Sequence, residues 1–418
     1  MNNYIVGIDI GSSKVCGSVG KIDKYGKLQI LGITSVICSG IKKAEVVDID
    51  NTSEAIRNCV RQLENMVDIE INHVFISLPA GICELVSNKG IIAISAEDKE
   101  VKGTDVKRVL EAAQLISVNP DKEIVGIVPI QYIIDGTDSV KDPIGMNCKR
   151  LEVDAQIITS ETKIITNLFK SFNRVNIKIE GTVLQSLGAA EVLLEKEEME
   201  RGVALVDIGA DTTTISIFKE GHLSFTEMFY LGGNSITNDI AMVLKIPLAE
   251  AERIKIKFGN VIRVSSDKEE LIKVSNGVES SIDVKYSVLS EIIEARVEEI
   301  LSFVYKSLQK SEFYNGISGL VLSGGGISLL NGITEISKEI IGKNVRVGSP
   351  KYVGASSPLY SNCIGILKHV SSKTKFNNNV EENFKEPKED KLKSYSSKSE
   401  KGNKGILLKI KNFLGDFF

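Results

Sequence analysis

The apolar positions at the start of the chain follow the pattern of β-strands, since runs rich in valine and isoleucine alternate with glycine-containing turns. Three strands are expected in succession, in "NYIVGIDIG", "KVCGSVGKI" and "LQILGITSVI". A helix at about 53–67 is predicted by residues at helical spacing, namely Ala55, Ile56, Cys59, Val60, Leu63, Met66 and Val67. The strand "HVFISLPA" comes next, and this succession predicts an α/β layer with a mixed sheet.

The same opening recurs in the second half of the chain. "GIDIGSSK" at 7–14 aligns with "ALVDIGADTT" at 204–213, so that Asp9 falls on Asp207 and Gly11 falls on Gly209. The strands "TTTISIFKEG" and "HLSFTEMFYLGG" follow this second copy. Further on we expect a long amphipathic helix at about 287–311, the strand "GLVLSGG", a helix near 331–341, the strand "NVRVG" and a helix near 356–370. The repeat predicts two related α/β halves.

Segments that the repeat does not explain are predicted to be insertions or appendages. The expected domains are a first half at 1–83 and 161–198, an inserted subdomain at 84–160, a second half at 199–230 and 314–370, an inserted helical subdomain at 231–313, a disordered linker at 371–403 and an amphipathic helix at 404–418. The linker is polar, mixed in charge and nearly free of aliphatic residues, which is typical of disorder.

Composition narrows the class of protein. A chain of 418 residues with 42% hydrophobic and 25% charged residues is expected to form two or more globular domains. The net charge of −4 gives no reason to expect nucleic acid. Six scattered cysteines and three histidines form no zinc or disulfide pattern. The start of the chain lacks the zones of a signal peptide, and no apolar run reaches the roughly 20 residues of a membrane span. We therefore expect the body to fold in the cytosol.

A strand that ends in Asp-x-Gly and turns tightly into the next strand can bind an anion, because the glycine lets backbone N–H groups approach it closely. The aspartate can hold Mg²⁺ through water. One such turn alone is more often an ordinary β-turn. Two of them at matching places predict a polyphosphate clamp between two domains. The glycines of "GLVLSGGGISLLNG" add a third loop of this kind, directly after a strand.

The three motifs "IDIGSSKV", "LVDIGADTT" and "GLVLSGGGISLLNG" resemble the two phosphate motifs and the adenosine motif of the actin-like ATPase superfamily. Within it, the chain is similar to the FtsA family of bacterial cell-division proteins in "DVKRVLEAAQ", "KDPIGMNCKRLEVDAQIIT", "LGGNSITNDIAMVLKIPLAEAERIKIKFG" and "IIEARVEEI". The resemblance spans residues 4 to about 370 and the terminal helix. It implies a duplicated actin-like (ribonuclease-H-like) fold, with 84–160 as the insertion typical of that family.

The resemblance also implies roles for individual residues in binding ATP with Mg²⁺. Asp9 and Asp207 would face the phosphates and hold Mg²⁺ through water. Gln185 would orient the attacking water, although a solvated helix residue is an equal alternative, and Lys255 would reach the ribose or base unless it is a simple surface lysine. The remaining residues implied for ATP are Gly11, Ser12, Ser13 and Lys14 in the first loop, Gly209, Thr212 and Thr213 in the second, and Gly324, Gly325 and Gly326 beside the adenosine.

One departure concerns the second loop, which reads Ala210-Asp211 where the superfamily commonly has two glycines. A non-glycine residue restricts the backbone, and a carboxylate near phosphates repels them. We expect Asp211 to disfavour tight binding and fast hydrolysis, and Asp211→Gly to leave binding intact or to tighten it. Nothing else supplies an acid–base pair or nucleophile, so we expect a slow ATP-dependent switch and not a turnover enzyme.

The last fifteen residues, "KGILLKIKNFLGDFF", carry an apolar stripe at helical spacing. The stripe comprises Ile406, Ile410, Phe413, Leu414 and Phe417, widened by Leu407 and Phe418 and flanked by Lys409 and Lys411. It predicts a helix lying in the surface of an anionic membrane. Docking on the body of the protein or on a partner is the alternative.

Together these features predict an ATP-binding adaptor on the cytoplasmic face of the membrane at the division septum. The resemblance implies that it assembles with itself, tethers the ring of the tubulin-like protein FtsZ and recruits later division proteins. An actin-like pilus-assembly ATPase is the main alternative. A small-molecule kinase would need a catalytic aspartate, and a chaperone would need a β domain after the second half, for which the sequence offers no candidate.

Overall fold

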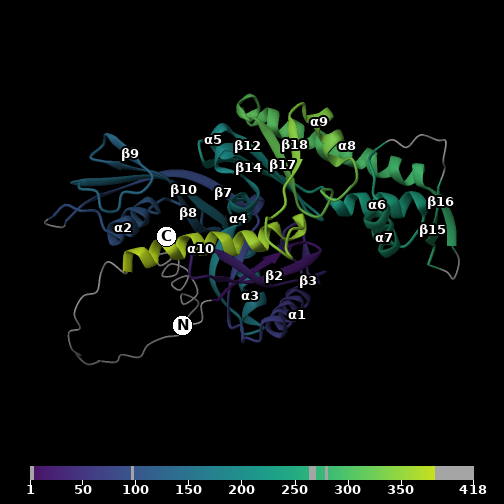
Figure 1. Cartoon of the computed structure of the whole chain (residues 1–418), viewed down its shortest axis with the longest axis horizontal. Coiled ribbons are helices and arrows are strands. Elements are labelled where there is room, and N and C mark those ends of the chain that lie inside the picture. The colour runs from purple at the N-terminus through teal and green to yellow at the C-terminus, as the bar shows by residue number, and fades with distance from the viewer. Residues whose placement is uncertain (1–3, 96–97, 263–269, 278–280, 382–418) are drawn as a thin grey trace.

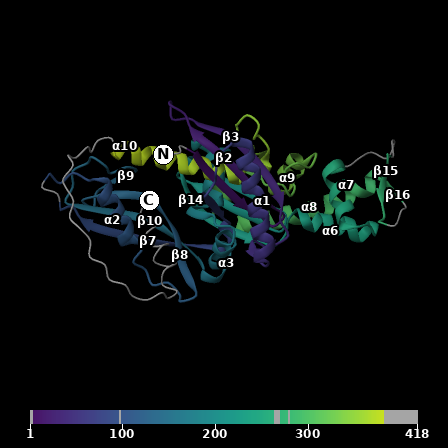
Figure 2. The same ribbon diagram turned by 90° about the horizontal axis from the view of Figure 1, so that it is seen from below.

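The computed structural model describes residues 4–95, 98–262, 270–277 and 281–381 (Figure 1). Two five-stranded sheets form the centre of the molecule, and one inserted subdomain lies at each end of its long axis, as both views show (Figure 2). Most of the expected linker (382–403) and all of the expected amphipathic helix (404–418) lie outside the described residues.

The first sheet has the order β11-β6-β1-β2-β3. Its strands are β1 (Tyr4–Ile10), β2 (Lys14–Ile22), β3 (Leu28–Ile37), β6 (His73–Leu78) and β11 (Lys178–Leu184). Alternate residues of a strand point to opposite faces, so Val6, Ile8 and Ile10 pack in the core with α1 (Ile49–Val67) and α3 (Thr162–Asn173). Asp9 therefore points to the other face, where Gly7 approaches α10 (Ser361–Glu381).

The second sheet repeats this plan with the order β14-β13-β12-β17-β18. Its strands are β12 (Val203–Ile208), β13 (Thr213–Lys219), β14 (His222–Phe229), β17 (Gly319–Ser323) and β18 (Asn344–Val347). Each half opens with an antiparallel hairpin, β1–β2 in the first and β12–β13 in the second. The first strand of each hairpin also pairs in parallel with a later strand, β1 with β6 and β12 with β17. The duplication expected from the sequence is thereby confirmed.

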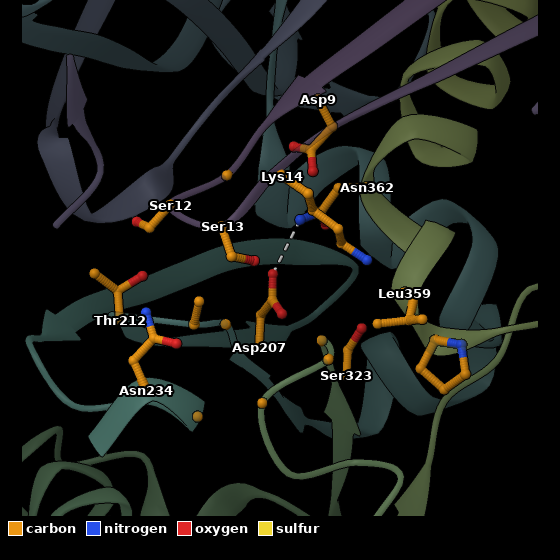
Figure 3. A pocket seen from close by; sticks show the side chains of 18 of the residues that line it. Asp9, Ser12, Ser13, Lys14, Asp207, Thr212, Asn234, Ser323, Leu359 and Asn362 are labelled. Atoms are coloured by element: carbon orange, nitrogen blue, oxygen red, sulfur yellow. Dashed lines mark hydrogen bonds between the residues drawn. The ribbon is translucent and has the colours of Figure 1, made fainter. Parts of the chain in front are cut away.

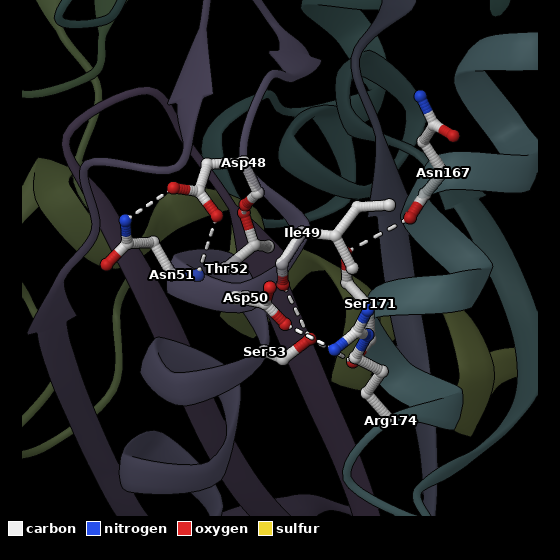
Figure 4. Close-up of polar contacts among 9 residues, drawn as sticks. All are labelled: Asp48, Ile49, Asp50, Asn51, Thr52, Ser53, Asn167, Ser171 and Arg174. Atoms are coloured by element: carbon white, nitrogen blue, oxygen red, sulfur yellow. Dashed lines mark hydrogen bonds and ion pairs between the residues drawn. The ribbon is translucent and has the colours of Figure 1, made fainter.

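Polar contacts hold the start of α1 against α3 (Figure 4). Asp48 caps α1 by accepting bonds from the backbone N–H of Asn51 at 3.0 Å and from its Nδ2 at 2.6 Å. The Ser53 hydroxyl donates to the carbonyl of Ser171 on α3 at 2.9 Å, and Arg174 pairs with Asp50. A short hairpin, β4 (Ile41–Lys42) and β5 (Glu45–Val46), directly precedes this pair of packed helices.

The inserted subdomain of the first half is a sheet of order β7-β10-β8-β9 covered by one helix. It comprises β7 (Cys83–Ala93), α2 (Gly103–Ala113), β8 (Lys122–Ile134), β9 (Asp138–Val140) and β10 (Arg150–Glu161). It has an apolar core of its own, which includes Val109, Ile127 and Leu151. The expected helix and strands of this segment are all present.

The insertion in the second half comprises α6 (Gly233–Leu244), α7 (Leu248–Phe258), β15 (Leu271–Ser275), β16 (Ser281–Lys285) and α8 (Tyr286–Lys310). It is not purely helical, because β15 and β16 pair as an antiparallel hairpin. The apolar residues of this hairpin, Ile272, Val274 and Val284, alternate with exposed ones and join the core of the second half. This alternation is the strand signal that the overall helical pattern masked.

The helices α4 (Gln185–Leu193) and α10 cross at two glycines, because a Cβ on Gly365 would lie 2.4 Å from the carbonyl carbon of Gly188. α10 continues to Glu381, past the linker boundary expected at 371, and Val370 and Ser371 on it are buried.

The shorter elements are α5 (Lys196–Arg201), α9 (Ile333–Ile341) and the 3₁₀ turns Ala80–Ile82, Tyr314–Gly316 and Pro358–Tyr360. Within the described residues, no helix combines the length and apolar character that a membrane crossing requires.

Candidate functional site

The two Asp-x-Gly turns have the same backbone geometry. The N–H of Gly11 donates to the carbonyl of Lys14 at 3.0 Å, and the N–H of Gly209 donates to the carbonyl of Thr212 at 2.8 Å. In the first hairpin Asp9 is paired with Cys16, and in the second Asp207 is paired with Thr214. Each half therefore presents an equivalent turn with an aspartate two residues before the glycine.

Both turns open onto one cavity of about 350 Å³ between the two halves. Figure 3 shows Asp9 and Asp207 on opposite sides of this cavity, with Lys14 and Asn362 between them. The residues expected at the site that line the cavity are Asp9, Gly11, Ser12, Ser13, Lys14, Gln185, Asp207, Gly209, Thr212, Lys255, Gly324, Gly325 and Gly326. Thr213 lies elsewhere: it is buried and its hydroxyl donates to the carbonyl of Leu231 at 2.8 Å. Thr214, the next residue on the strand, faces the cavity in its place.

The Asp9 carboxylate is buried and held by two neutral donors. Its Oδ1 accepts a bond from the Ser77 hydroxyl at 2.6 Å and one from Nε2 of Gln185 at 2.8 Å. Burial raises the pKa of Asp9, and these hydrogen bonds oppose that rise. Gln185 is thus a bonded residue of the site and not a solvated helix residue.

The Asp207 carboxylate has its own partner, from an element distant in sequence. Its Oδ2 accepts a bond from Nδ2 of Asn362, at the start of α10, at 3.1 Å. Burial raises the pKa of Asp207 to about 6, the bond from Asn362 lowers it, and the nearby charge of Asp9 raises it further. Sequence reasoning missed Ser77 and Asn362. For Asn362 the available signal was a polar residue directly before the apolar run "CIGIL".

The residues at the centre of the cavity fit a hydrated cation that is bound together with phosphates. Among the described residues, no group of three or more histidine, cysteine, aspartate or glutamate side chains could hold a metal by itself. The carboxylates of Asp9 and Asp207 nevertheless face the cavity, and the buried oxygens Ser323 Oγ and Asn362 Oδ1, which belong to lining residues, have no protein partner. Mg²⁺ keeps several waters and commonly takes its other ligands from phosphates. The donor set is compatible with that mode of binding.

The glycine loop after β17 comes very close to the Asp-x-Gly turn of the second half. Gly324 has a φ of 84°, and a Cβ there would lie 2.3 Å from Oδ1 of Asp207 and 2.4 Å from the carbonyl oxygen of Ile208. No side chain can occupy that position. Apolar side chains from Ile256, Leu329 and Leu359 line the same cavity. A flat apolar group fits such a surface.

Lys255 is not a surface lysine, contrary to the simpler expectation. Its side chain is buried, and Nζ donates to the carbonyl of Gly233 at 3.0 Å and to the hydroxyl of Thr237 at 2.8 Å. It also pairs with Glu252 at 2.6 Å. Burial lowers its pKa. These contacts place a cation at the wall of the cavity, beside the glycine loop.

The expectation that Asp211 would repel phosphates is not supported by its position. Asp211 lies outside the lining of the cavity. Its Oδ1 accepts a bond from Nδ2 of Asn234 at 2.7 Å, and its Oδ2 accepts one from the backbone N–H of Lys43 at 3.2 Å. The carboxylate lies between the β4–β5 hairpin and the start of α6, and each of these elements donates a hydrogen bond to one of its oxygens.

Two duplicated sheets with a cleft between them, each supplying an Asp-x-Gly turn, define an actin-like protein. Solved structures agree on the fold. A PilM-PilN type IV pilus biogenesis complex matches with a TM-score of 0.59 at 14% identity, covering 87% of this chain and 97% of that chain. MreB5 of Spiroplasma citri bound to AMPPNP matches with a TM-score of 0.54 at 12% identity, covering 92% and 100%.

Comparison of the sequence with curated proteins gives the family. A family profile described as "Cell division protein FtsA" matches residues 204–365, and one described as "SHS2 domain inserted in FTSA" matches 81–159. The cell division protein FtsA of Bacillus subtilis is 36% identical over 368 residues, which is 88% of this chain and 83% of that protein. That of Borreliella burgdorferi is 32% identical over 100% of this chain and 99% of that protein. The chain belongs to the FtsA family of cell division proteins, and this family is favoured over the pilus-assembly alternative.

Proposed function

We propose that this protein is an ATP-dependent adaptor of cell division. It binds ATP with Mg²⁺ between its two halves, assembles with itself on the cytoplasmic face of the membrane, and holds the FtsZ ring there for later division proteins to join. The observation that carries the proposal is the pair of equivalent Asp-x-Gly turns facing one cavity. Backbone N–H groups from two such turns at one cavity suit a ligand with several negative charges.

In this proposal each end of the cavity has its own task. The turns at Gly11 and Gly209 offer backbone N–H groups and hydroxyls to the phosphates, and Lys14 neutralises part of their charge. The glycine loop at 324–326 and its apolar neighbours receive the adenosine. Asp9 and Asp207 hold Mg²⁺ through its waters, and the cation supplies charge neutralisation at the phosphates when it is bound.

The polar groups of the site favour a switch over rapid turnover. The amide of Gln185 is held by Asp9, so it can orient a water molecule beside the phosphates. An amide has no basic group with which to remove a proton from that water. We propose that hydrolysis is slow and that the bound nucleotide controls assembly.

Membrane attachment is proposed for residues 404–418, from their sequence alone. Partial burial of seven apolar side chains contributes on the order of 5–10 kcal/mol before the ordering of the helix is subtracted. Lys409 and Lys411 each add about 1 kcal/mol beside anionic headgroups. One copy would bind reversibly, and several copies on an assembled filament would bind firmly through avidity.

Co-sedimentation tests the adaptor as a whole. The full chain is mixed with vesicles containing phosphatidylglycerol and with purified FtsZ, with and without ATP·Mg²⁺. We expect FtsZ to sediment with the vesicles only when the protein is present, and more of it when ATP is added. FtsZ that stays in the supernatant while the protein itself sediments would refute the tether.

Calorimetry tests the nucleotide site separately. Asp9→Ala and Asp207→Ala should each weaken the binding of ATP·Mg²⁺ at least tenfold, because each removes a carboxylate from the cation. Asp138→Ala on the exposed strand β9 is the matched control and should bind as the parent does. Unchanged affinity in both cavity variants would refute the proposed site.

A further inference from the structure

The β4–β5 hairpin crosses from the first half of the molecule to the second at the edge of the cavity. Its tip consists of Lys43 and Ala44, and Ala44 lines the cavity. The phosphate-binding turns themselves account for the cavity walls on either side. The hairpin is a separate element, and the proposed function assigns it no task.

The hairpin and the segment that leads into it are each joined to the first Asp-x-Gly turn by one hydrogen bond. The N–H of Cys38 donates to the carbonyl of Ser13 at 3.0 Å, and the N–H of Ala44 donates to the Ser12 hydroxyl at 3.4 Å. At its base, the carbonyl of Gly40 accepts bonds from Val47 and Asp48 at 2.9 and 3.0 Å, directly before the capped start of α1. The hairpin therefore moves with the first half.

The tip of the hairpin is also bound to the second half. The N–H of Lys43 donates to Oδ2 of Asp211 at 3.2 Å, and Nζ of Lys43 lies 5.2 Å from the centre of the Tyr230 ring. Asn234 holds the other oxygen of Asp211 at 2.7 Å, and its own backbone N–H donates to the carbonyl of Ala210 at 2.8 Å. Asp211 thus links the second phosphate turn, the start of α6 and the hairpin.

The backbone at the tip stays in an unfavourable conformation. Lys43 and Ala44 both have positive φ, 51° and 66°, in a two-residue loop between paired strands. Such loops are type I′ turns, which prefer asparagine followed by glycine. A lysine and an alanine hold this conformation at a cost that the contacts to Ser12 and Asp211 offset.

We infer that Asp211 is a positioning residue that fastens the β4–β5 hairpin over the phosphate end of the cavity and slows the release of bound nucleotide. The inference rests on the proposed binding of nucleotide in that cavity. A phosphate group leaving past Ala44 requires the two halves to separate at this edge. Separation breaks the bond between Lys43 and Asp211 and the contact between Lys43 and Tyr230.

The test measures release and binding rates of N-methylanthraniloyl-ADP with the full chain in a stopped-flow instrument. Asp211→Ala should accelerate release about five- to tenfold, which is the effect expected for loss of one charge-assisted hydrogen bond at a partly exposed position. The association rate should stay within about twofold, because the open state already lacks this bond. Asp138→Ala removes an exposed carboxylate on the inserted subdomain of the first half and should leave both rates unchanged.

A second variant acts in the opposite direction and does not touch Asp211. Ala44→Gly relieves the positive φ at the tip and leaves both contacts of Lys43 in place, so release should be slower than in the parent. This variant carries the test if Asp211→Ala does not fold. Release from Asp211→Ala at the parent's rate would overturn the inference. An association rate that falls by as large a factor as the release rate rises would also overturn it, since Asp211 would then shape the turn and not fasten the hairpin. A parent chain that binds no nucleotide would refute the proposed function itself.

Discussion

Replacing Asp207 with asparagine should stabilise the nucleotide-free protein while weakening its binding of ATP·Mg²⁺. Burial raises the pKa of this carboxyl from its ordinary value of 3.8 to about 6. At neutral pH the folded protein therefore holds a charge that would be better solvated in the unfolded chain. Asparagine removes that charge, and its oxygen can still accept the bond from Asn362.

The size of the effect follows from the pKa. A rise of about two pKa units corresponds to roughly 3 kcal/mol at most. The carboxylate faces a cavity that water enters, so we expect a gain of about 1–2 kcal/mol in the free energy of unfolding. Because the pKa of an acid is raised, its stabilising contribution is complete below about pH 4 and is lost as the pH rises through about 6. The advantage of the variant should therefore be full at pH 8 and about half as large at pH 5.

Urea unfolding of the nucleotide-free parent and of Asp207→Asn at pH 8 and pH 5 measures this difference. Asp48→Asn is the control, because hydrogen bonds from Asn51 lower the pKa of that capping aspartate. The control should bring no gain at either pH. A variant at position 207 that is no more stable than the parent at pH 8, or a gain that is the same at both pH values, would refute the reasoning.

Three further changes test other parts of the molecule. Gly365→Ala should lower stability by about 1–3 kcal/mol in thermal unfolding, because the clash with Gly188 outweighs a helix-propensity gain of about 1 kcal/mol. Gly188→Ala, whose Cβ would meet its nearest atom at 3.1 Å, should cost less stability. A larger loss for Gly188→Ala than for Gly365→Ala would count against a tight helix crossing. Gln185→Ala should leave ATP affinity within about threefold but reduce phosphate release in a coupled assay, since only the orientation of water is lost; equal hydrolysis would remove Gln185 from that role. Phe413→Asp or Phe417→Asp should release the protein from anionic vesicles in a flotation assay with ATP binding unchanged; retained flotation, together with a lower melting temperature on deletion of 404–418, would indicate docking on the body instead.

The sequence by itself determined the duplicated fold and most of the cavity wall. The turns at Gly11 and Gly209 could be predicted because a tight turn after a strand depends on a few neighbouring residues. Alternation along β1 and β12 also decides that Asp9 and Asp207 point away from the cores that contain Ile8 and Ile208. The repeat then placed the two turns at equivalent positions.

The tertiary structure alone decided which side chains meet those aspartates. Asn362 contacts Asp207 although 155 residues separate them along the chain, and Lys43 reaches Asp211 across the cleft over 168 residues. The burial of Lys255 likewise depends on where α7 packs against the start of α6. Local preferences act over a few residues, whereas these contacts are set by how the two halves, the crossing helices and the hairpin come together. No pattern within one segment contains that information.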